Sequence, residues 1–501
     1  MRIPLTNIRT IEEINRKISN GDAVVLTTQE MTSLVEEKGV KIAAKEVDVV
    51  TTGTFGAMCS SGAVINLGHA DPPIKIQRAW INDVEVSHTG AAVDLYIGAT
   101  HTSDTQPIKY GGGHIIHELI EGKQVELRAI ASGTDCYPRT RIETTLTKDD
   151  LNQFYLINFR NGYQRYNCAT NSRDETIYTY MSKLLPHHRN ATFSGSGCFN
   201  PLCNDPSYET IGIGTRIFLG GAQGYIIGEG TQHDPGGRFG TLMVKGDCKK
   251  MSSEYIRGAS FTNYGNTLYV GLGVPIPILN EGLAKQTAVS DEEIFTNIVD
   301  YGVPRRSRPT LGKVSYKQLK SGSVIIQNKA VKVSPLSSLK KAHEIANLLK
   351  KWINNAQFYL TSPVETLPKD TIVKPMKQTQ EVIFVEALIK PAVTCQITES
   401  ITDIAERLIS RSVNHIIVID ETGRLEGIVT SWDITRAIAN GLTKLPDIIT
   451  TRVVTSDPNE PIEAASRRMA QHNISALPVV DQNNVVLGIL TSEDLSKLIG
   501  G

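Results

Sequence analysis

The end of the chain repeats itself, and this repeat constrains the fold more than any other feature. Residues 399–438 (ESITDIAERLISRSVNHIIVIDETGRLEGIVTSWDITRAI) can be laid without a gap over residues 460–499 (EPIEAASRRMAQHNISALPVVDQNNVVLGILTSEDLSKLI). In each copy a helix with regularly spaced apolar residues precedes a short apolar strand, and after a turn and a second strand an S-x-D sequence opens another helix. The tail is therefore predicted to fold as two similar units of helices and strands.

The two copies also share a short polar motif. GIVTSWD at 427–433 matches GILTSED at 488–494. The duplicated motif closely resembles the cystathionine-β-synthase (CBS) domain pair, a regulatory module that usually binds adenosine-containing ligands between its copies. From this resemblance we expect a Bateman-type α/β module over 382–501, with repeats at about 385–440 and 446–501.

The resemblance implies roles for two residues in each copy. Thr430 and Thr491 would meet a phosphate or a comparable polar group, and Asp433 and Asp494 would accept hydrogen bonds from ribose hydroxyls. A threonine before a helix start combines a hydroxyl with free backbone N–H groups, and a carboxylate can accept two donors. The alternative is that these residues only cap helices. S-adenosylmethionine or an adenine nucleotide is the expected ligand, and the pair favours a homodimer.

Upstream of the repeat, the sequence predicts a linker and one large domain. Residues 361–381 are polar and contain several prolines without helical or strand periodicity, which is typical of a linker. Residues 337–358 place apolar side chains on one face, as in the last helix of a domain. We therefore expect a mixed α+β catalytic domain over 1–360. Further helices are predicted near 10–19, 28–38, 114–121, 148–158, 174–185 and 291–299. Strands are predicted near 46–52, 92–97, 124–130, 211–218, 224–228, 240–244 and 268–272.

Charge and composition exclude several classes of protein. Lys plus Arg and Asp plus Glu both number 52, so no overall positive field attracts nucleic acid or an anionic membrane. The N-terminus lacks the apolar stretch of a secretory signal, and the apolar run at 269–279 is too short to span a membrane. The seven cysteines are odd in number and scattered, unlike a secreted disulfide framework. We expect a cytoplasmic protein without nucleic-acid or membrane partners.

Two motifs in the large domain have a functional and a simpler interpretation. Gly212-Ile-Gly214 begins like a dinucleotide fingerprint, but Ile217 stands where the third glycine is required. His114 and His117 lie one helical turn apart after three glycines, a spacing that suits a metal. The more favoured role of this segment is a helix start that offers N–H groups to an anion, so no metal site is predicted.

Three cysteines leave an alternative open. Cys198 and Cys203, with Cys168 upstream, could hold an iron–sulfur cluster, although no C-x2-C sequence accompanies them. Packed structural thiols fit these positions better. An iron–sulfur-dependent lyase therefore remains the first alternative function, and a non-catalytic sensor of adenosyl ligands is the second.

Cys59 and Cys136 have surroundings that favour chemistry. Cys59 precedes Ser60-Ser61-Gly62, whose short side chains would let backbone N–H groups approach a ligand or a thiolate. Cys136 lies in GTDCYPRTR at 133–141, where the cations of Arg139 and Arg141 favour the thiolate while Asp135 opposes it. The simpler interpretation turns Cys136 inward and pairs both arginines with surface acids.

Four longer stretches carry a second resemblance. TTGTFGAMCSSGAVINLGHADPPIK (51–75), YGGGHIIHELIEGK (110–123) with ELRAIASGTDCYPRTRIE (126–143), LNQFYLINFRNGYQRYNCATN (151–171) and GIGTRIFLGGAQGYIIGEGTQH (212–233) together resemble the archaeal L-aspartate semialdehyde sulfurtransferases of homocysteine biosynthesis. The resemblance spans nearly all of 1–360. It implies that sulfide and aspartate semialdehyde form homocysteine through a cysteine persulfide, with electrons from a small ferredoxin-like protein.

The family's persulfide cysteine falls on Cys136, and its second cysteine of interest falls on Cys59. A persulfide attacking the aldehyde creates an oxyanion, and N–H groups near Ser60, Ser61 or Gly112 would stabilise it. His69 or His114 would protonate the departing hydroxyl. Arg139 or Arg141 would instead bind the substrate carboxylate. Cys59 would attack the persulfide to form a Cys59–Cys136 disulfide, although their separation in sequence does not establish that they are close.

Overall fold

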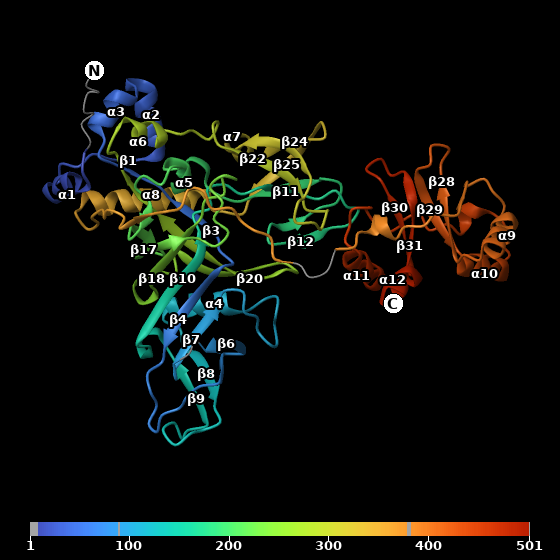
Figure 1. Ribbon diagram of the computed structural model, residues 1–501, viewed down its shortest axis with the longest axis horizontal. Helices are drawn as coiled ribbons and strands as arrows, with labels where there is room; N and C mark the ends of the chain where they lie inside the picture. The colour runs from blue at the N-terminus through green and yellow to red at the C-terminus, as the bar shows by residue number, and fades with distance from the viewer. Residues whose placement is uncertain (1–8, 89–90, 378–381, 500–501) are drawn as a thin grey trace. The chain divides into compact units, whose positions relative to one another are not determined.

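The computed structural model describes residues 9–88, 91–377 and 382–499 (Figure 1). It contains two compact units, the first comprising Met1–Val299 and Thr310–Pro375 and the second comprising Asp300–Pro309 and Met376–Gly501. Helices and strands are mixed in both units, which confirms the predicted α+β class. Among the described residues, no helix is long and apolar enough to cross a membrane.

A 13-stranded sheet forms the centre of the first unit. Its strand order is β19-β20-β16-β17-β18-β10-β4-β7-β6-β5-β8-β9, and β3 pairs with β20. The bounds are β3 (Thr54–Ala57), β4 (Ser61–Asn66), β5 (Arg78–Ile81), β6 (Val84–His88), β7 (Asp94–Gly98), β8 (Val125–Ile130), β9 (Arg141–Leu146), β10 (Gln153–Asn161), β16 (Arg216–Leu219), β17 (Ala222–Glu229), β18 (Leu242–Asp247), β19 (Ile256–Phe261) and β20 (Gly265–Gly273).

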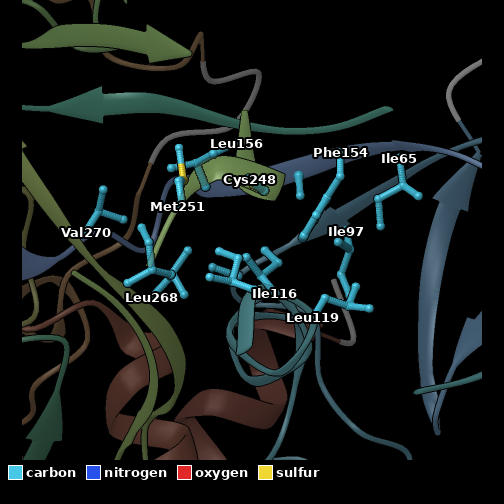
Figure 2. Packing of buried hydrophobic residues seen from close by; sticks show 14 of the residues in the cluster. Ile65, Ile97, Ile116, Leu119, Phe154, Leu156, Cys248, Met251, Leu268 and Val270 are labelled. Carbon is cyan, nitrogen blue, oxygen red and sulfur yellow. The ribbon is translucent and has the colours of Figure 1, made fainter. Parts of the chain in front are cut away.

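Helix α4 (Gly112–Glu121) packs on this sheet. Its apolar side chains join those of β4, β7 and β10 in one buried cluster, because residues two apart in a strand face the same side. Figure 2 shows Ile116 and Leu119 of α4 beside Ile97 of β7 and Phe154 of β10. This core holds β4 rigidly between β10 and β7.

Besides two two-stranded pairs, β12 (Ile177–Thr179) with β13 (Ser182–Leu184) and β15 (Gly212–Ile213) with β26 (Glu365–Thr366), the first unit contains two smaller sheets. The strand order β23-β22-β11-β14-β25-β24 makes a six-stranded sheet, and β1-β2-β21 makes a three-stranded one. The bounds are β1 (Val25–Thr27), β2 (Val49–Thr51), β11 (Cys168–Thr170), β14 (Asn190–Phe193), β21 (Pro275–Pro277), β22 (Phe295–Asp300), β23 (Thr310–Ser315), β24 (Ser323–Ile326) and β25 (Lys329–Pro335). The other helices are α1 (Ile11–Asn20), α2 (Thr28–Lys38), α3 (Val40–Glu46), α5 (Pro201–Asn204), α6 (Glu281–Gln286), α7 (Tyr316–Lys320) and α8 (Leu339–Asn354).

Three of the predicted helices are wrong. Residues 148–158 form a short 3-10 turn (Lys148–Asp150) followed by β10, residues 174–185 form the hairpin of β12 (Ile177–Thr179) and β13 (Ser182–Leu184), and residues 291–299 enter β22. In β10 burial alternates along the strand, with Phe154, Leu156 and Asn158 buried. A period of two marks a strand with one face on the core. The predicted helices at 10–19, 28–38, 114–121 and 337–358 are confirmed as α1, α2, α4 and α8.

The first residues of the predicted linker 361–381 are folded onto the first unit. Strand β26 (Glu365–Thr366) pairs with β15 (Gly212–Ile213), and Leu367 is buried. A ring nitrogen of His233 lies 3.0 Å from the carbonyl oxygen of Pro368. Residues 378–381 of the predicted linker lie outside the described residues.

The second unit shows the repeat directly. Helix α9 (Ile401–Arg411), β28 (His415–Ile419), β29 (Leu425–Thr430) and α10 (Ser431–Asn440) correspond in order to α11 (Ile462–His472), β30 (Ala476–Val480), β31 (Val486–Thr491) and α12 (Ser492–Ile499), and β27 (Thr394–Cys395) pairs with β28. Equivalent ion pairs occur in both copies: Glu399 with Arg407 and Glu460 with Arg468, each at 2.5 Å.

Candidate functional site

Cys59 lies in a tight turn between β3 and β4. The backbone N–H of Ser61 donates to the carbonyl of Met58 at 3.0 Å, which closes the turn. The Cys59 side chain is half-buried, and its Sγ lies 3.3 Å from Oγ1 of Thr267 in β20. Because β4 and β20 are both central strands, the turn presents this thiol from a rigid base.

A group of tyrosines surrounds this thiol. Burial raises the pKa of Tyr163, Tyr264 and Tyr269, and a charge on Cys59 would raise each further, which places these phenols close to the thiol. Ring centroids are 5.4 Å apart for Tyr163 and Tyr166, 6.3 Å for Tyr166 and Tyr180, and 6.1 Å for Tyr180 and Tyr264. We call these five residues the tyrosine wall. The raised pKa keeps the hydroxyls of Tyr163, Tyr264 and Tyr269 protonated at neutral pH, so they can donate to an oxyanion.

Buried polar side chains lie next to the Cys59 turn. Asn158 of β10 is directly opposite Ser61 of β4, and the backbone N–H of Phe159 donates to the carbonyl of Ser60 at 3.1 Å. Oγ of Ser61, Nδ2 of Asn158 and Nδ2 of Asn161 are buried and have no hydrogen-bond partner among the described residues. A buried donor left unpaired costs about 1–3 kcal/mol. Such a cluster is typical of a site that a polar ligand fills.

Arg160 adds a cation beside these donors. Its Nη1 donates to Oε1 of Gln232 at 2.6 Å and its Nε to Oγ1 of Thr231 at 3.2 Å. The guanidinium also lowers the pKa of Tyr163, against the larger effect of burial. Arg160 is therefore placed to bind a carboxylate near Cys59.

The glycines that begin α4 do not provide the predicted N–H donors. The N–H of Gly112 donates to the carbonyl of His101 at 2.9 Å, and that of Gly113 donates to Ala99 at 3.0 Å. A Cβ on Gly112 would collide with the carbonyl oxygen of Gly98. Gly112 is thus required for close backbone packing, and the unpaired donors beside Cys59 are side chains instead.

His114 lies near the same end of the sheet. Its ring stacks on Tyr110 with centroids 5.4 Å apart, and burial lowers its pKa. Nδ1 of His114 is buried with no hydrogen-bond partner among the described residues. Glu118 accepts from the Tyr110 hydroxyl at 2.7 Å, while His117 lies 3.5 Å from Glu121. Within the described ranges, no group of three or more His, Cys, Asp or Glu could hold a metal.

Cys136 occupies a different setting, an exposed turn between β8 and β9. Thr134 and Tyr137 exchange backbone hydrogen bonds at 2.9 and 3.1 Å, and Oγ1 of Thr134 lies 3.6 Å from the Cys136 Sγ. The rings of His69 and Tyr137 have centroids 6.0 Å apart. His69 therefore accompanies Cys136 and lies away from Cys59.

The two arginines of the Cys136 segment each contact an oxygen of a nearby residue. Arg139 donates through Nη2 to the carbonyl of Asp71 at 2.8 Å, which ties the Cys136 turn to the loop after β4. Arg141 forms an ion pair with Glu143 on the exposed face of β9. Both guanidinium groups are thus directed at these oxygens rather than at a common pocket.

The predicted site residues form two groups. Ser60, Ser61, Gly112 and His114 lie near Cys59 at the start of β4, whereas His69, Arg139 and Arg141 lie near Cys136 beyond the other end of β4. In Figure 1, β4, β7, β6, β8 and β9 extend together away from the centre of the first unit. One chain does not bring the two cysteines together.

The remaining cysteines of the first unit are packing residues. Burial raises the pKa of Cys168 to about 12, of Cys198 to about 11 and of Cys203 to about 12. Cys168 and Cys198 belong to a buried apolar cluster, and Sγ of Cys203 donates to the carbonyl of Gln164 at 3.0 Å. Neutral thiols with these contacts fit the structural interpretation and form no ligand set among the described residues.

The predicted nucleotide-binding residues begin α10 and α12. Thr430 and Asp433 form a capping box, with the threonine hydroxyl donating to Oδ2 of Asp433 at 2.7 Å, and Thr491 and Asp494 repeat it at 2.6 Å. The other carboxylate oxygen faces Arg436 in the first copy and Lys390 in the second. Helix capping is therefore one role of all four residues.

Comparison with known proteins assigns the class. The family model described as homocysteine biosynthesis enzyme, sulfur-incorporation, matches residues 23–360, and the CBS domain model matches 385–440 and 446–501. The chain therefore belongs to this family of sulfur-incorporating enzymes and carries a CBS pair. The predicted resemblance and the predicted enzyme class, a sulfurtransferase, are confirmed.

The relatives are similar over their full length. The chain is 51% identical to the L-aspartate semialdehyde sulfurtransferase of Methanosarcina acetivorans, covering 98% of this chain and 99% of the relative. It is 50% identical to that of Methanocaldococcus jannaschii, covering 99% of both. Among solved structures, a CBS domain pair in complex with 5′-methylthioadenosine and S-adenosyl-L-methionine is 40% identical and covers 24% of this chain and 98% of that one, with a TM-score of 0.24.

Sequence reasoning missed several residues around Cys59. Asn158, Arg160, Asn161 and Tyr163 all come from one tract, LNQFYLINFRNGYQRYNCATN. A strand that changes from alternating apolar residues to asparagine, arginine and tyrosine is a signal that one end of the strand faces a polar site. The predicted helix over 148–158 concealed that signal.

Proposed function

We propose that the chain makes homocysteine from L-aspartate semialdehyde and sulfide. In the overall reaction, one hydrogen sulfide, two electrons and two protons convert the aldehyde to a primary thiol and release one water. The aldehyde carbon therefore gains one sulfur and two electrons. The observation that carries the proposal is the half-buried Cys59 beside the unpaired donors of Ser61 and Asn158. Full-length relatives named for this activity support the choice of substrate.

Cys136 is the sulfur carrier in this proposal. Its exposed turn gives sulfide free access. Hydrosulfide attacks a Cys59–Cys136 disulfide at the Cys136 sulfur, so Cys59 leaves as a thiol and Cys136 becomes a persulfide. No electrons are consumed in this step, because the disulfide bond is replaced by the persulfide bond.

The carbon chemistry takes place beside Cys59. The outer persulfide sulfur attacks the aldehyde carbon, and the resulting oxyanion is stabilised by Ser61, Asn158 and the tyrosine wall. Arg160 binds the substrate carboxylate. The Cys59 thiolate then attacks the Cys136 sulfur, which re-forms the disulfide and releases the hemithioacetal thiolate. Loss of water gives a thioaldehyde.

Two electrons and two protons reduce the thioaldehyde to the thiol. The protein holds no resident redox group in this proposal, so a reduced ferredoxin-like iron–sulfur protein supplies the electrons. His114 is placed to assist loss of water as a base, because burial lowers its pKa and keeps the ring neutral at neutral pH.

The test of the proposal is the mass of each cysteine variant after anaerobic exposure to sulfide. We expect the oxidised wild-type chain to gain one sulfur atom, and Cys136→Ser to gain none and to lose at least about a thousandfold in homocysteine formation. Cys203→Ala is the matched control and retains both. A Cys136→Ser variant that still makes homocysteine at the wild-type rate would refute Cys136 as the carrier.

We also propose that the CBS pair binds an adenosyl ligand such as S-adenosylmethionine, and that the chain is a homodimer. Two equivalent helix starts, at Thr430 and Thr491, support a duplicated ligand site. Ile409, Trp432 and Ile438 on α9 and α10 are 79%, 72% and 71% exposed. Large apolar side chains exposed together favour a protein partner, and a second copy of this chain is the proposed one.

A further inference from the structure

Cys59 and Cys136 belong to opposite ends of one sheet. Cys59 precedes Ser61, the first residue of β4, whereas the Cys136 turn is held against residues 69–73, which follow Asn66, the last residue of β4. At a rise of about 3.3 Å per residue, Ser61 and Asn66 alone are roughly 16 Å apart. A disulfide requires Cα atoms within about 7 Å. The two thiols of one chain therefore cannot form the disulfide of the proposed cycle in this conformation.

The sheet between them offers no hinge. Strand β4 pairs with β10 from Ser61 to Asn66 and with β7 from Gly62 to Asn66, in both cases without a register shift. Ala63 and Ile65 of β4 are fully buried in the core that includes α4. Bringing the Cys136 turn back to Cys59 would break these ladders and expose this core, so motion within one chain is a poor route.

The two cysteines differ in a way that suits two chains. Cys136 is exposed on a turn that projects beyond the sheet, while Cys59 is half-buried beside the tyrosine wall. We propose that the active centre is shared between two copies of this chain, with Cys136 of one copy entering the Cys59 site of the other. This inference rests on the proposed function. It adds that neither copy alone completes the cycle.

The shared step is a balanced thiol exchange. The Cys59 thiolate of one copy attacks the sulfur of Cys136 of the other, which carries the substrate-bound outer sulfur. One sulfur–sulfur bond forms between the two copies, one breaks, and the electron pair leaves with the substrate thiolate. The product on the protein is an intersubunit disulfide, which the next hydrosulfide opens.

Mixed dimers test the proposal. Differently tagged Cys59→Ser and Cys136→Ser chains are co-expressed and purified through both tags, and homocysteine is measured with sulfide, aspartate semialdehyde and a low-potential chemical reductant. In the mixed dimer one centre lacks both cysteines and the other has both. We expect about half of the wild-type rate, although each variant alone is inactive. Dimers of wild-type with Cys59→Ser/Cys136→Ser chains are the reciprocal control, and there each centre lacks one cysteine, so we expect no activity.

The opposite pattern would overturn the shared centre. An inactive first dimer with a half-active second dimer means that each chain uses its own two cysteines. A wild-type chain that is active and yet monomeric by native mass spectrometry would also overturn the shared centre. Mild oxidation gives a second readout, in which we expect a disulfide-linked dimer that Cys136→Ser abolishes. If Cys136→Ser alone keeps wild-type activity, the carrier role in the proposed function fails, which is distinguishable from failure of sharing.

Discussion

The Cys59 turn and the Cys136 turn belong to the same sheet but offer opposite environments. Cys59 is half-buried, contacts Thr267 and lies beside phenols whose pKa burial has raised. Cys136 is exposed on a four-residue turn, where its Sγ lies 3.6 Å from Oγ1 of Thr134. A sulfur carrier needs access to its donor, whereas attack on a carbonyl benefits from few water molecules and fixed donors. In the proposed cycle, this difference assigns loading with sulfur to Cys136 and the carbon chemistry to the Cys59 site.

Alkylation should show the largest contrast. Iodoacetamide reacts with thiolates, and burial raises the pKa of Cys168 to about 12 and of Cys198 to about 11, from an ordinary 9.0. Their thiolate fractions at pH 8 are thus about a hundredfold to a thousandfold below those of an ordinary thiol. We expect labelling of the native protein in the order Cys136, Cys59, then the buried thiols, measured by peptide mass spectrometry.

Unfolding provides the control for this order. In urea all seven cysteines should label at similar rates, because burial no longer raises any pKa. Native labelling of Cys198 as fast as that of Cys136 would contradict the contrast between the exposed Cys136 and the packed thiols.

The repeat and the CBS pair could be predicted from sequence because the chain contains two copies of the same segment that can be compared with each other. A gapless duplication carries its own periodicity, and Gly427 and Gly488 recur with it. The helix predicted over 148–158 failed for a physical reason. Leu151 and Phe154 have the i, i+3 spacing of a helical face, while Phe154 and Leu156 have the i, i+2 spacing of a strand face. Only pairing of β10 with β4 and β18 decides between them.

The site was only partly predictable. Cys59 and Cys136 stood out by their neighbours in sequence, but their separation depends on strand order in the sheet, which no local pattern encodes. The hydrogen-bond donors near Cys59 could not be identified from local sequence either. Backbone N–H groups at Gly112 were a sound expectation for a glycine-rich helix start, yet His101 and Ala99 already accept from that segment. Asn158 became visible only once its pairing with Ser61 was known.

The second prediction tests the Cys59 end. Asn158→Ala removes a buried amide whose Nδ2 has no partner among the described residues. We expect kcat/KM for aspartate semialdehyde to fall about a hundredfold, the typical effect of removing one oxyanion donor. Stability should fall by only about 1 kcal/mol, because the hydrogen bond lost is the one from the Arg160 N–H to Oδ1.

Asn152→Ala is the matched control for this variant. Asn152 is exposed near the other end of β10 and donates to Oδ1 of Asn66 at 3.0 Å. Steady-state kinetics and thermal unfolding should show near wild-type activity for it. Equal activity of the two variants would mean that the unpaired amide at position 158 serves packing alone.

The smallest effect is expected for a variant of the second unit, which should change the local stability of one helix and leave the first unit unaffected. Thr430→Val removes the hydroxyl that accepts from the Asp433 N–H at 3.2 Å and donates to its carboxylate. Loss of such a cap costs about 1 kcal/mol. Hydrogen exchange of the α10 amides in the full chain should therefore accelerate about fivefold, with Thr435→Ala, an exposed mid-helix change, as the control.

Sulfur transfer without an adenosyl ligand should be unchanged in Thr430→Val, because this residue belongs to the second unit. Calorimetry with S-adenosylmethionine then distinguishes the two roles of the threonine. Weaker binding together with faster exchange means that Thr430 both caps α10 and contacts the ligand. Unchanged binding together with faster exchange means that Thr430 only caps α10, because the ligand then binds equally well without the threonine hydroxyl. Unchanged exchange would contradict the cap itself, and the capping box at Thr491 would need the same test.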